Sequence, residues 1–254
     1  MPSQWCVAAV TALNGARMPD LAAPLAATAL RDYPSDPVVL LAAAVNSEAR
    51  ALIQEQLGDL GDLYGLPSLS TATGRPQPGR DQVLQFLDPQ VPARRDVRAL
   101  RSEALEHLAG VLAADPENAD ARLRQARLFA LVGRDGEAVP ELAALSVGAG
   151  PVPLRYLAYL FLGQIQESAG RLVEAESAYR RATALEPLAQ TSRVALAHVM
   201  ARTDRRAEAQ AVLVPALDRN RPVSLVSDPF WVYPYIDPVK SRAPLKALRY
   251  RVLR

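Results

Sequence analysis

A pattern of small and large apolar residues recurs along this chain at a spacing of 34 residues. Its clearest copy is 156–187, which reads YLAYLFLGQIQESAGRLVEAESAYRRATALEP. Gly170 divides this copy into two helix-length halves, and Pro187 closes the second because proline does not continue a helix. The small residues Gly163, Ala175 and Ala182 would let the two helix backbones approach each other. A fixed period of this length predicts stacked helical hairpins.

Further copies follow the same phase. One lies 34 residues toward the C-terminus, where Leu196 and Ala197 take the places of Leu162 and Gly163. Another lies 37 residues toward the N-terminus, and the Gly- and Pro-rich link 147–153 absorbs the difference. The second helix of one more copy lies a further 34 residues back, and a weaker echo occurs near the N-terminus. The repetition therefore extends well beyond one hairpin.

The pattern closely resembles the tetratricopeptide repeat (TPR), in the degenerate form found in bacterial chains. The resemblance covers 94–217 well and 4–56 loosely, and Gln166 stands where the family prefers tyrosine. It implies an all-α fold, an α-solenoid of antiparallel helical hairpins wound into a TPR-like superhelix. In this family the first helix of each hairpin lines the inner, concave surface.

Four segments are expected along the chain: degenerate N-terminal helices (1–65), a Pro/Gly-rich connector (66–93), TPR-like repeats (94–222) and an aromatic and basic C-terminal cap segment (223–254). The connector carries Pro, Gly, Ser and Thr at the density of a loop. Two interpretations of it stay open. It is either a simple link, or a loop that folds against the groove or a partner.

Composition narrows the chemistry. Half of the residues are apolar, which is enough for a sizeable core, and β-branched residues form no alternating runs typical of strands. The 29 basic and 27 acidic residues nearly cancel to +2, which argues against nucleic acid as the partner of the whole molecule. The single cysteine, Cys6, excludes an intrachain disulfide and is expected to be a small buried side chain.

No apolar run is long enough for a membrane span, and the N-terminus lacks the pattern of a secretory signal. The chain is therefore expected to be soluble. Its location stays open between the cytoplasm and, if a signal was removed before this numbering, the periplasm.

Residue patterns of known catalytic sites are missing from the sequence. His107 and His198 are the only histidines, and neither has a carboxylate or cysteine at the spacing of a metal site. Phosphate-binding GxxxxGK[ST] and nucleophilic GxSxG motifs do not occur. We therefore predict a protein that is not an enzyme, with no cofactor, no metal and no small-molecule substrate.

The expected function is the binding of another protein or peptide in the groove formed by this concave surface. The first-helix positions that the TPR resemblance places there carry apolar, amide and charged side chains. These partner-binding candidates are Leu123, Arg127, Leu160, Gln164, Glu167, Val194, His198 and Arg202. The Lys and Asn residues with which related proteins clamp chaperone tails are missing, so that clamp is disfavoured. We expect apolar contacts, with Arg127 and Arg202 holding acidic groups of the partner.

The C-terminal segment concentrates aromatic residues, namely Phe230, Trp231, Tyr233 and Tyr235. One interpretation is a cap folded over the final repeat, because a solenoid must cover its last apolar face. The other is an exposed anchor for a partner. Beyond them, 240–254 is rich in Lys and Arg and is predicted to form an amphipathic helix with a basic face. This face is either solvated or bound to acidic protein, anionic lipid headgroups or RNA.

Two functional hypotheses follow. The first is an interaction scaffold that recruits a partner through the groove and the flanking segments. The second is a structural subunit of a larger, membrane-associated or soluble assembly, which it contacts through the aromatic and basic C-terminal segment and the connector. Membrane contact is expected only peripherally, through the basic helix.

Overall fold

The computed structural model describes residues 3–63, 97–217 and 228–235 of the 254-residue chain. All described residues lie in helices, turns or short links, and none lies in a strand, so the prediction of an all-α fold is confirmed. The connector 66–93 and the basic segment 240–254 lie outside the described residues. No helix among those described is both long and apolar enough to span a bilayer.

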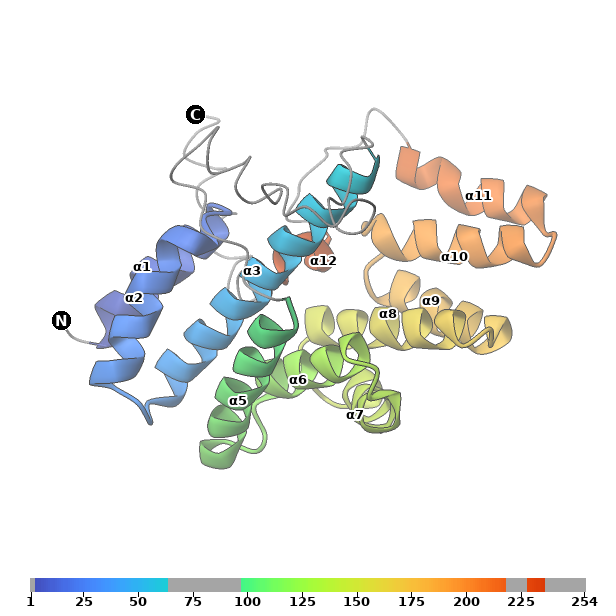
Figure 1. Cartoon of the computed structure of the whole chain (residues 1–254). Helices are drawn as coiled ribbons and strands as arrows, with labels where there is room; N and C mark the ends of the chain where they lie inside the picture. The colour runs from blue at the N-terminus through green and yellow to red at the C-terminus, as the bar shows by residue number, and fades with distance from the viewer. Residues whose placement is uncertain (1–2, 64–96, 218–227, 236–254) are drawn as a thin grey trace, which may run out of the picture. The chain divides into compact units, whose positions relative to one another are not determined.

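The chain divides into two compact units, 1–107 and 108–254, and the division falls within α5 (Val97–Ala114). In the first unit α1 (Ser3–Gly15), α2 (Pro19–Asp32) and α3 (Pro37–Leu63) pack against one another. Figure 1 shows these three helices in blue to cyan.

Small residues fill the core of the first unit. Val10, Ala22, Ala26 and Ala43 form one buried cluster, and Cys6 packs in a second one beside it in the same three helices. Cys6 is 3% exposed, as the sequence predicted for a small buried side chain. Alanine at these contacts lets three helices approach closely, which explains why a chain poor in large aromatics still forms a core here.

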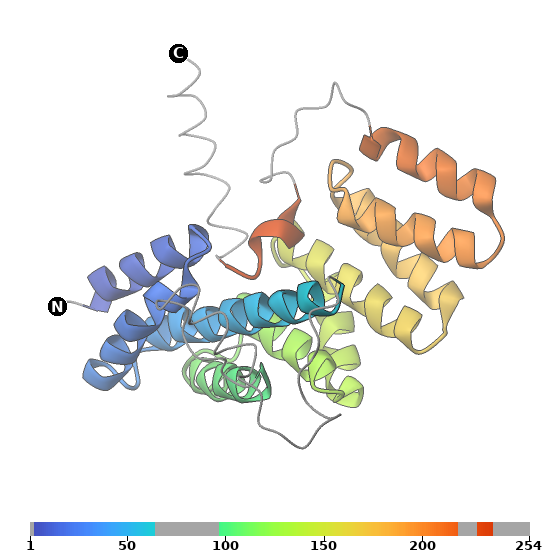
Figure 2. The same cartoon turned by 45° about the horizontal axis from the view of Figure 1, so that its top comes forward.

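The described part of the second unit contains three successive helical hairpins, whose helices can be followed in Figures 1 and 2. They are formed by α6 (Ala119–Leu131) with α7 (Asp135–Val147), α8 (Val152–Ser168) with α9 (Leu172–Leu185), and α10 (Thr191–Arg202) with α11 (Arg206–Leu217). Each helix packs against its neighbours in sequence. A short helix, α12 (Pro229–Val232), contacts α8. The best copy of the repeat in the sequence is therefore the central hairpin.

Glycines make two of the turns between paired helices. Gly133 joins α6 to α7 with φ of 81°, and Gly170 joins α8 to α9 with φ of 75°. This left-handed conformation is strained for residues with a Cβ atom, so glycine is the favoured residue at both turns. The turn predicted at Gly170 is confirmed.

Close packing of α8 on α9 depends on Gly163. A Cβ atom at this position would lie 2.8 Å from Cζ of the Tyr179 ring, and closer still to Cε1 and Cδ1. Ala175 and Ala182 on α9 are 0% exposed. The small residues selected from the repeat thus stand where the two helices meet.

Candidate functional site

Two of the eight predicted groove residues belong to the core. Leu123 and Leu160 are both 0% exposed and lie in the large apolar cluster of the second unit. Leu160 lies on α8, which packs against α6, α7, α9 and α12 and is buried along nearly its whole length. The covered part of such a helix is apolar on every side, as residues 156–163 are here. These two leucines therefore do not offer an accessible contact surface.

The other six residues lie on α6, α8 and α10, the first helices of the three hairpins. We call the surface that these helices form the first-helix face. At one end of it, the guanidinium of Arg127 donates to Oε1 of Gln164 at 2.7 Å. The same guanidinium lies 4.5 Å above the ring of Phe161, a cation–π distance. Arg127 is thereby held in one orientation between α6 and α8.

Glu167 connects α8 to α10. Its Oε1 lies 2.7 Å from Nδ1 of His198 and accepts from Nη1 of Arg202 at 3.4 Å. Its Oε2 accepts the Tyr179 hydroxyl at 2.8 Å. Burial and this bond to Glu167 both raise the pKa of Tyr179, so the phenol keeps its proton and remains a donor.

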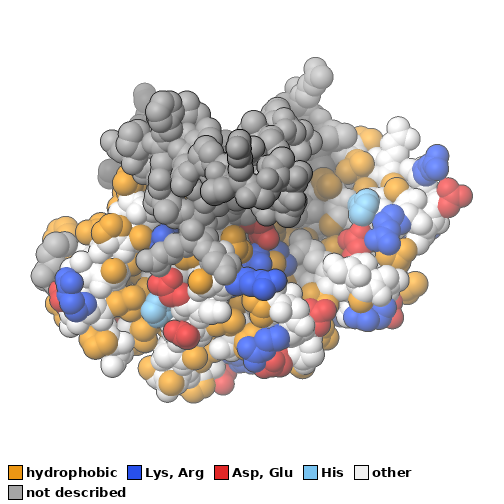
Figure 3. Space-filling model, in the orientation of Figure 1, with side chains coloured by type: hydrophobic (Ala, Val, Ile, Leu, Met, Phe, Trp, Pro, Cys, Tyr) orange, Lys and Arg blue, Asp and Glu red, His pale blue; other side chains and the backbone are white. Residues whose placement is uncertain are grey.

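These five side chains, Arg127, Gln164, Glu167, His198 and Arg202, are called the polar strip below. His198 and Arg202 are the accessible members, with side chains 61% and 44% exposed. Figure 3 shows histidine, acidic and basic side chains next to one another over α10. Val194, one helical turn before His198, is an exposed apolar residue. The structure thus brings the polar candidates together and leaves one apolar candidate beside them.

The first-helix face also holds a segment of the chain itself, residues 228–235, called the aromatic segment. Asp228 is 3% exposed, and both of its carboxylate oxygens are bonded. Oδ1 accepts the Tyr156 hydroxyl at 3.0 Å, and Oδ2 accepts the backbone N–H and the hydroxyl of Thr191 at 2.8 and 2.7 Å. Asp228 also caps α12 by accepting from the N–H of Phe230.

The location of Asp228 explains how a carboxylate is tolerated there. Thr191 is the first residue of α10, so its N–H points out of a helix N-terminus, where a negative charge is stabilised. Burial, followed by the charge and hydrogen bond of Asp228, raises the pKa of the Tyr156 phenol. Tyr156 therefore stays protonated and keeps donating to the carboxylate.

Aromatic rings continue the contact along α8. The Phe161 ring meets that of Tyr233 edge-on at 5.3 Å between centroids, and that of Phe230 at 6.4 Å. Arg124 of α6, which is 0% exposed, donates to the backbone carbonyl of Tyr233 at 3.0 Å and lies 4.6 Å over its ring. Three helices, α6, α8 and α10, thus each contribute a hydrogen-bond donor to one short segment.

The aromatic residues differ in exposure. Tyr233 and Tyr235 are buried and Phe230 is partly buried, whereas Trp231 is 46% exposed. The cap interpretation placed them over the final repeat, but their contacts described above lie on the first-helix face. The choice between a cap and a partner anchor stays a prediction, now with Trp231 as the exposed member.

The sequence reasoning missed Arg124, Tyr156, Thr191 and Asp228. A partial signal was available, because Asp-Pro ahead of an aromatic turn is a typical helix start. It indicates the cap of α12 but not the receiving residues, which lie 37 to 109 positions away.

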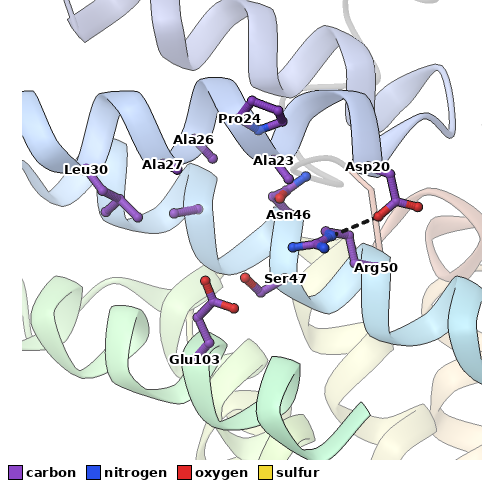
Figure 4. A pocket seen from close by; sticks show the side chains of 11 residues that line it. Asp20, Ala23, Pro24, Ala26, Ala27, Leu30, Asn46, Ser47, Arg50 and Glu103 are labelled. Carbon is purple, nitrogen blue, oxygen red and sulfur yellow. Dashed lines mark hydrogen bonds and ion pairs between the residues drawn. The ribbon is translucent and has the colours of Figure 1, made fainter. Parts of the chain in front are cut away.

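The first unit contains a separate cavity of about 290 Å³ (Figure 4). Asp20 and Arg50, joined by an ion pair of 2.9 Å, lie at its wall together with Asn46. Asn46 also donates to Asn14 and to the carbonyl of Pro19, at 2.9 and 2.7 Å. Three of its polar groups, Asp20, Arg50 and Asn46, thus already have hydrogen-bond or ion-pair partners within the protein.

Groupings of metal ligands are lacking across the part of the chain that is described. No set of three or more His, Cys, Asp or Glu side chains in it is arranged to hold a metal ion. The absence of a cofactor and of catalysis stays a prediction.

Comparisons with known proteins bear on the fold. No family model matches the sequence, and no curated protein matches it. Among solved structures, PilW, a widely conserved type IV pilus biogenesis factor, superposes with a TM-score of 0.57 at 14% identity, over 95% of this chain and 87% of PilW. This chain has a TPR-type fold.

Two structures of MamA agree with this assignment. The RS-1 ArsTM double mutant of MamA matches with a TM-score of 0.52 at 16% identity, over 85% of this chain and 93% of MamA. MamA from residue 41 onward, from Desulfovibrio magneticus RS-1, matches with a TM-score of 0.50 at 16% identity, over 86% and 97% of the two chains. At such identities the likeness concerns the fold alone.

Proposed function

We propose that this protein is a non-catalytic interaction scaffold that binds a segment of a partner protein on the first-helix face. One observation carries the proposal: this face already holds a short peptide segment, residues 228–235, through hydrogen bonds from three different helices. A surface that binds one segment in this way has the donors and the aromatic platform that peptide recognition requires.

The polar strip extends this surface beyond the aromatic segment. Arg202 and His198 are exposed and adjoin the exposed apolar side chain of Val194. A partner segment with acidic and apolar groups on one side would match them. Glu167 already accepts from Arg202 at 3.4 Å, so a partner carboxylate would share this guanidinium rather than meet an isolated charge.

The similar solved structures support a scaffold over an enzyme, because PilW is described as a biogenesis factor and shares the TPR-type fold. Fold alone does not fix a function. The proposal therefore rests on the contacts of the first-helix face. We expect the partner to be a protein of a larger assembly.

Charge reversal on the polar strip tests the proposal. Tagged protein is used to capture partners from the source cells, and the captured proteins are quantified by mass spectrometry. We expect Arg202→Glu to lower capture of the specific partner at least about tenfold, the loss of a charge-assisted contact. Arg127→Glu should act in the same direction. Arg206→Glu is the matched control, because Arg206 is 86% exposed and lies on α11, a second helix.

Circular dichroism of each variant verifies that the helices are intact. Equal capture by Arg202→Glu, Arg127→Glu and the control, with folded proteins throughout, would contradict binding through this face.

A second candidate function rests on the exposed Trp231. A half-exposed tryptophan beside a buried aromatic cluster is a residue type that often carries interface energy. In this alternative the chain is a structural subunit that contacts its assembly through the aromatic segment. Trp231→Ala should then release it from the assembly while leaving the melting temperature unchanged. Retention of Trp231→Ala in the assembly would refute this alternative.

A further inference from the structure

We propose that the aromatic segment is a resident occupant of the first-helix face, and that the partner presents a segment of the same chemistry which displaces it. That chemistry is an aspartate at the start of a helical turn, followed by aromatic rings two and five residues later, as in Asp228, Phe230 and Tyr233. The inference rests on the proposed function, because it specifies the partner of the same face.

The receiving residues are specific for such a segment. Tyr156 and Thr191 present two hydroxyls and one backbone N–H to a single carboxylate. A neutral side chain at this position would not accept from all three donors. The carboxylate also lies against the N-terminus of α10, which favours a negative charge. The face therefore selects an acidic residue at this position.

The ring contacts set the distance to the aromatic residues. Phe161 is 0% exposed and meets the rings of Phe230 and Tyr233 edge-on. Arg124 fixes the second of these by bonding its backbone carbonyl and lying over its ring. Because Arg124 donates to a backbone carbonyl, this hydrogen bond depends on the path of the segment's backbone and not on the identity of one side chain.

Polar anchoring is what makes the occupant exchangeable. Apolar packing stabilises a permanent contact between helices at least as well as buried polar groups do. The buried polar groups here instead determine which segment fits the face. The helix within the aromatic segment has only four residues, and α8 is the helix with which it packs most. An incoming segment with the same groups satisfies the same donors, so exchange leaves no buried group unpaired.

The tether sets the strength of the competition. Residues 218–227 link α11 to Asp228, and a short link gives a tethered segment an effective concentration in the ~mM range. A free segment of equal affinity must therefore compete with its attached counterpart. Its apparent affinity rises when the attached segment is weakened, because a larger fraction of the molecules is open.

The test uses the full-length protein and a fluorescently labelled peptide with the sequence of residues 226–236, followed by fluorescence anisotropy. We expect Asp228→Ala to bind this peptide at least about tenfold more tightly than the unaltered protein does. A peptide in which the aspartate is replaced by alanine should bind neither protein. If Asp228→Ala does not fold, Asp228→Asn keeps the side-chain size and weakens the same bonds.

Changes on the receiving side separate exchange from general loosening. In the Asp228→Ala protein, Tyr156→Phe removes one donor to the incoming carboxylate and should weaken peptide binding about tenfold. Tyr159→Phe is the matched control, because this tyrosine also lies on α8 but its hydroxyl accepts from Arg181 instead. The control should leave peptide binding unchanged.

Failure of the peptide to bind Asp228→Ala would overturn the inference, and partner capture that still depends on Arg202 would then leave the proposed function intact. A concentration-dependent dimer of the unaltered protein, abolished in Asp228→Ala, would also overturn it, because the segment would then occupy the face of a second copy. Tighter peptide binding in Asp228→Ala, lost in Tyr156→Phe, is the result that supports it.

Discussion

Replacement of Gly163 by alanine should destabilise the second unit. The new methyl group would lie within 3.0 Å of three carbons of the Tyr179 ring, a distance that real Cβ contacts do not show. The ring is 1% exposed, and its hydroxyl is bonded to Glu167 at 2.8 Å, so it has little freedom to move aside. Overpacking costs about 1–3 kcal/mol, and losing a hydrogen bond to a charged group costs about 1.5–3 kcal/mol.

Alanine is the better helix former by about 1 kcal/mol, which offsets part of this cost. We therefore expect Gly163→Ala to lower the free energy of unfolding by about 1.5–5 kcal/mol. Urea denaturation followed by circular dichroism at 222 nm measures the change. Gly136→Ala is the matched control: this glycine is on α7, and a Cβ there would meet nothing within 4 Å. It should be neutral or stabilising by up to about 1 kcal/mol.

The double variant Gly163→Ala with Tyr179→Leu identifies the cause. If the clash with the ring is responsible, the two changes should cost at least about 1 kcal/mol less together than the sum of the single variants. A Gly163→Ala protein as stable as the unaltered chain would refute the packing argument. Strict additivity of the two changes would refute the assignment to Tyr179.

Two further perturbations probe local features of the helices. Asn118→Ala removes the side-chain cap that accepts from the N–H of Ala121 at 3.1 Å, and it should cost about 0.5–2 kcal/mol in the same denaturation experiment, whereas Asn118→Ser should restore most of the loss. Burial lowers the pKa of His107 below its ordinary value of 6.5 against the opposing charges of Glu103 and Glu106, so the unfolded chain binds this proton more readily. The contribution of His107 to the free energy of unfolding should therefore be complete above about pH 6.5 and fall as the pH drops below that value. The His107→Gln protein should lose stability less steeply between about pH 7.5 and about pH 5.5. Equal slopes for the two proteins would contradict this interpretation.

The hairpin architecture could be predicted from the sequence because its determinants are local and periodic. Gly170 and Gly163 stand at fixed positions in the repeat, and each has a steric reason that is independent of the rest of the chain. The phase of the repeat also placed Arg127, Glu167 and Arg202 on the first helices of the hairpins. In the structure Arg127 donates to Gln164, and Arg202 donates to Glu167.

The burial of Leu123 and Leu160 could not be predicted in the same way. Phase identifies the helix and the direction of a side chain, but exposure depends on what else covers that side. The aromatic segment covers Phe161 on this face, and Tyr156 and Arg124 precede the residues that they bond, Asp228 and Tyr233, by 72 and 109 positions. No periodic pattern connects residues at these separations, so this part of the site required the structure.

The hydrogen bond from Arg124 to Tyr233 has a consequence for how the second unit unfolds. A plain array of hairpins contacts only its sequence neighbours, so its terminal hairpin opens independently of the others. Here the aromatic segment joins α6 to the start of α10 across the central hairpin. Opening of the α10–α11 hairpin at Thr191 is therefore coupled to loss of the hydrogen bond between Arg124 of α6 and Tyr233. Amide hydrogen exchange should accordingly report one cooperative transition across the three hairpins, where an unbridged array would fray progressively from its end.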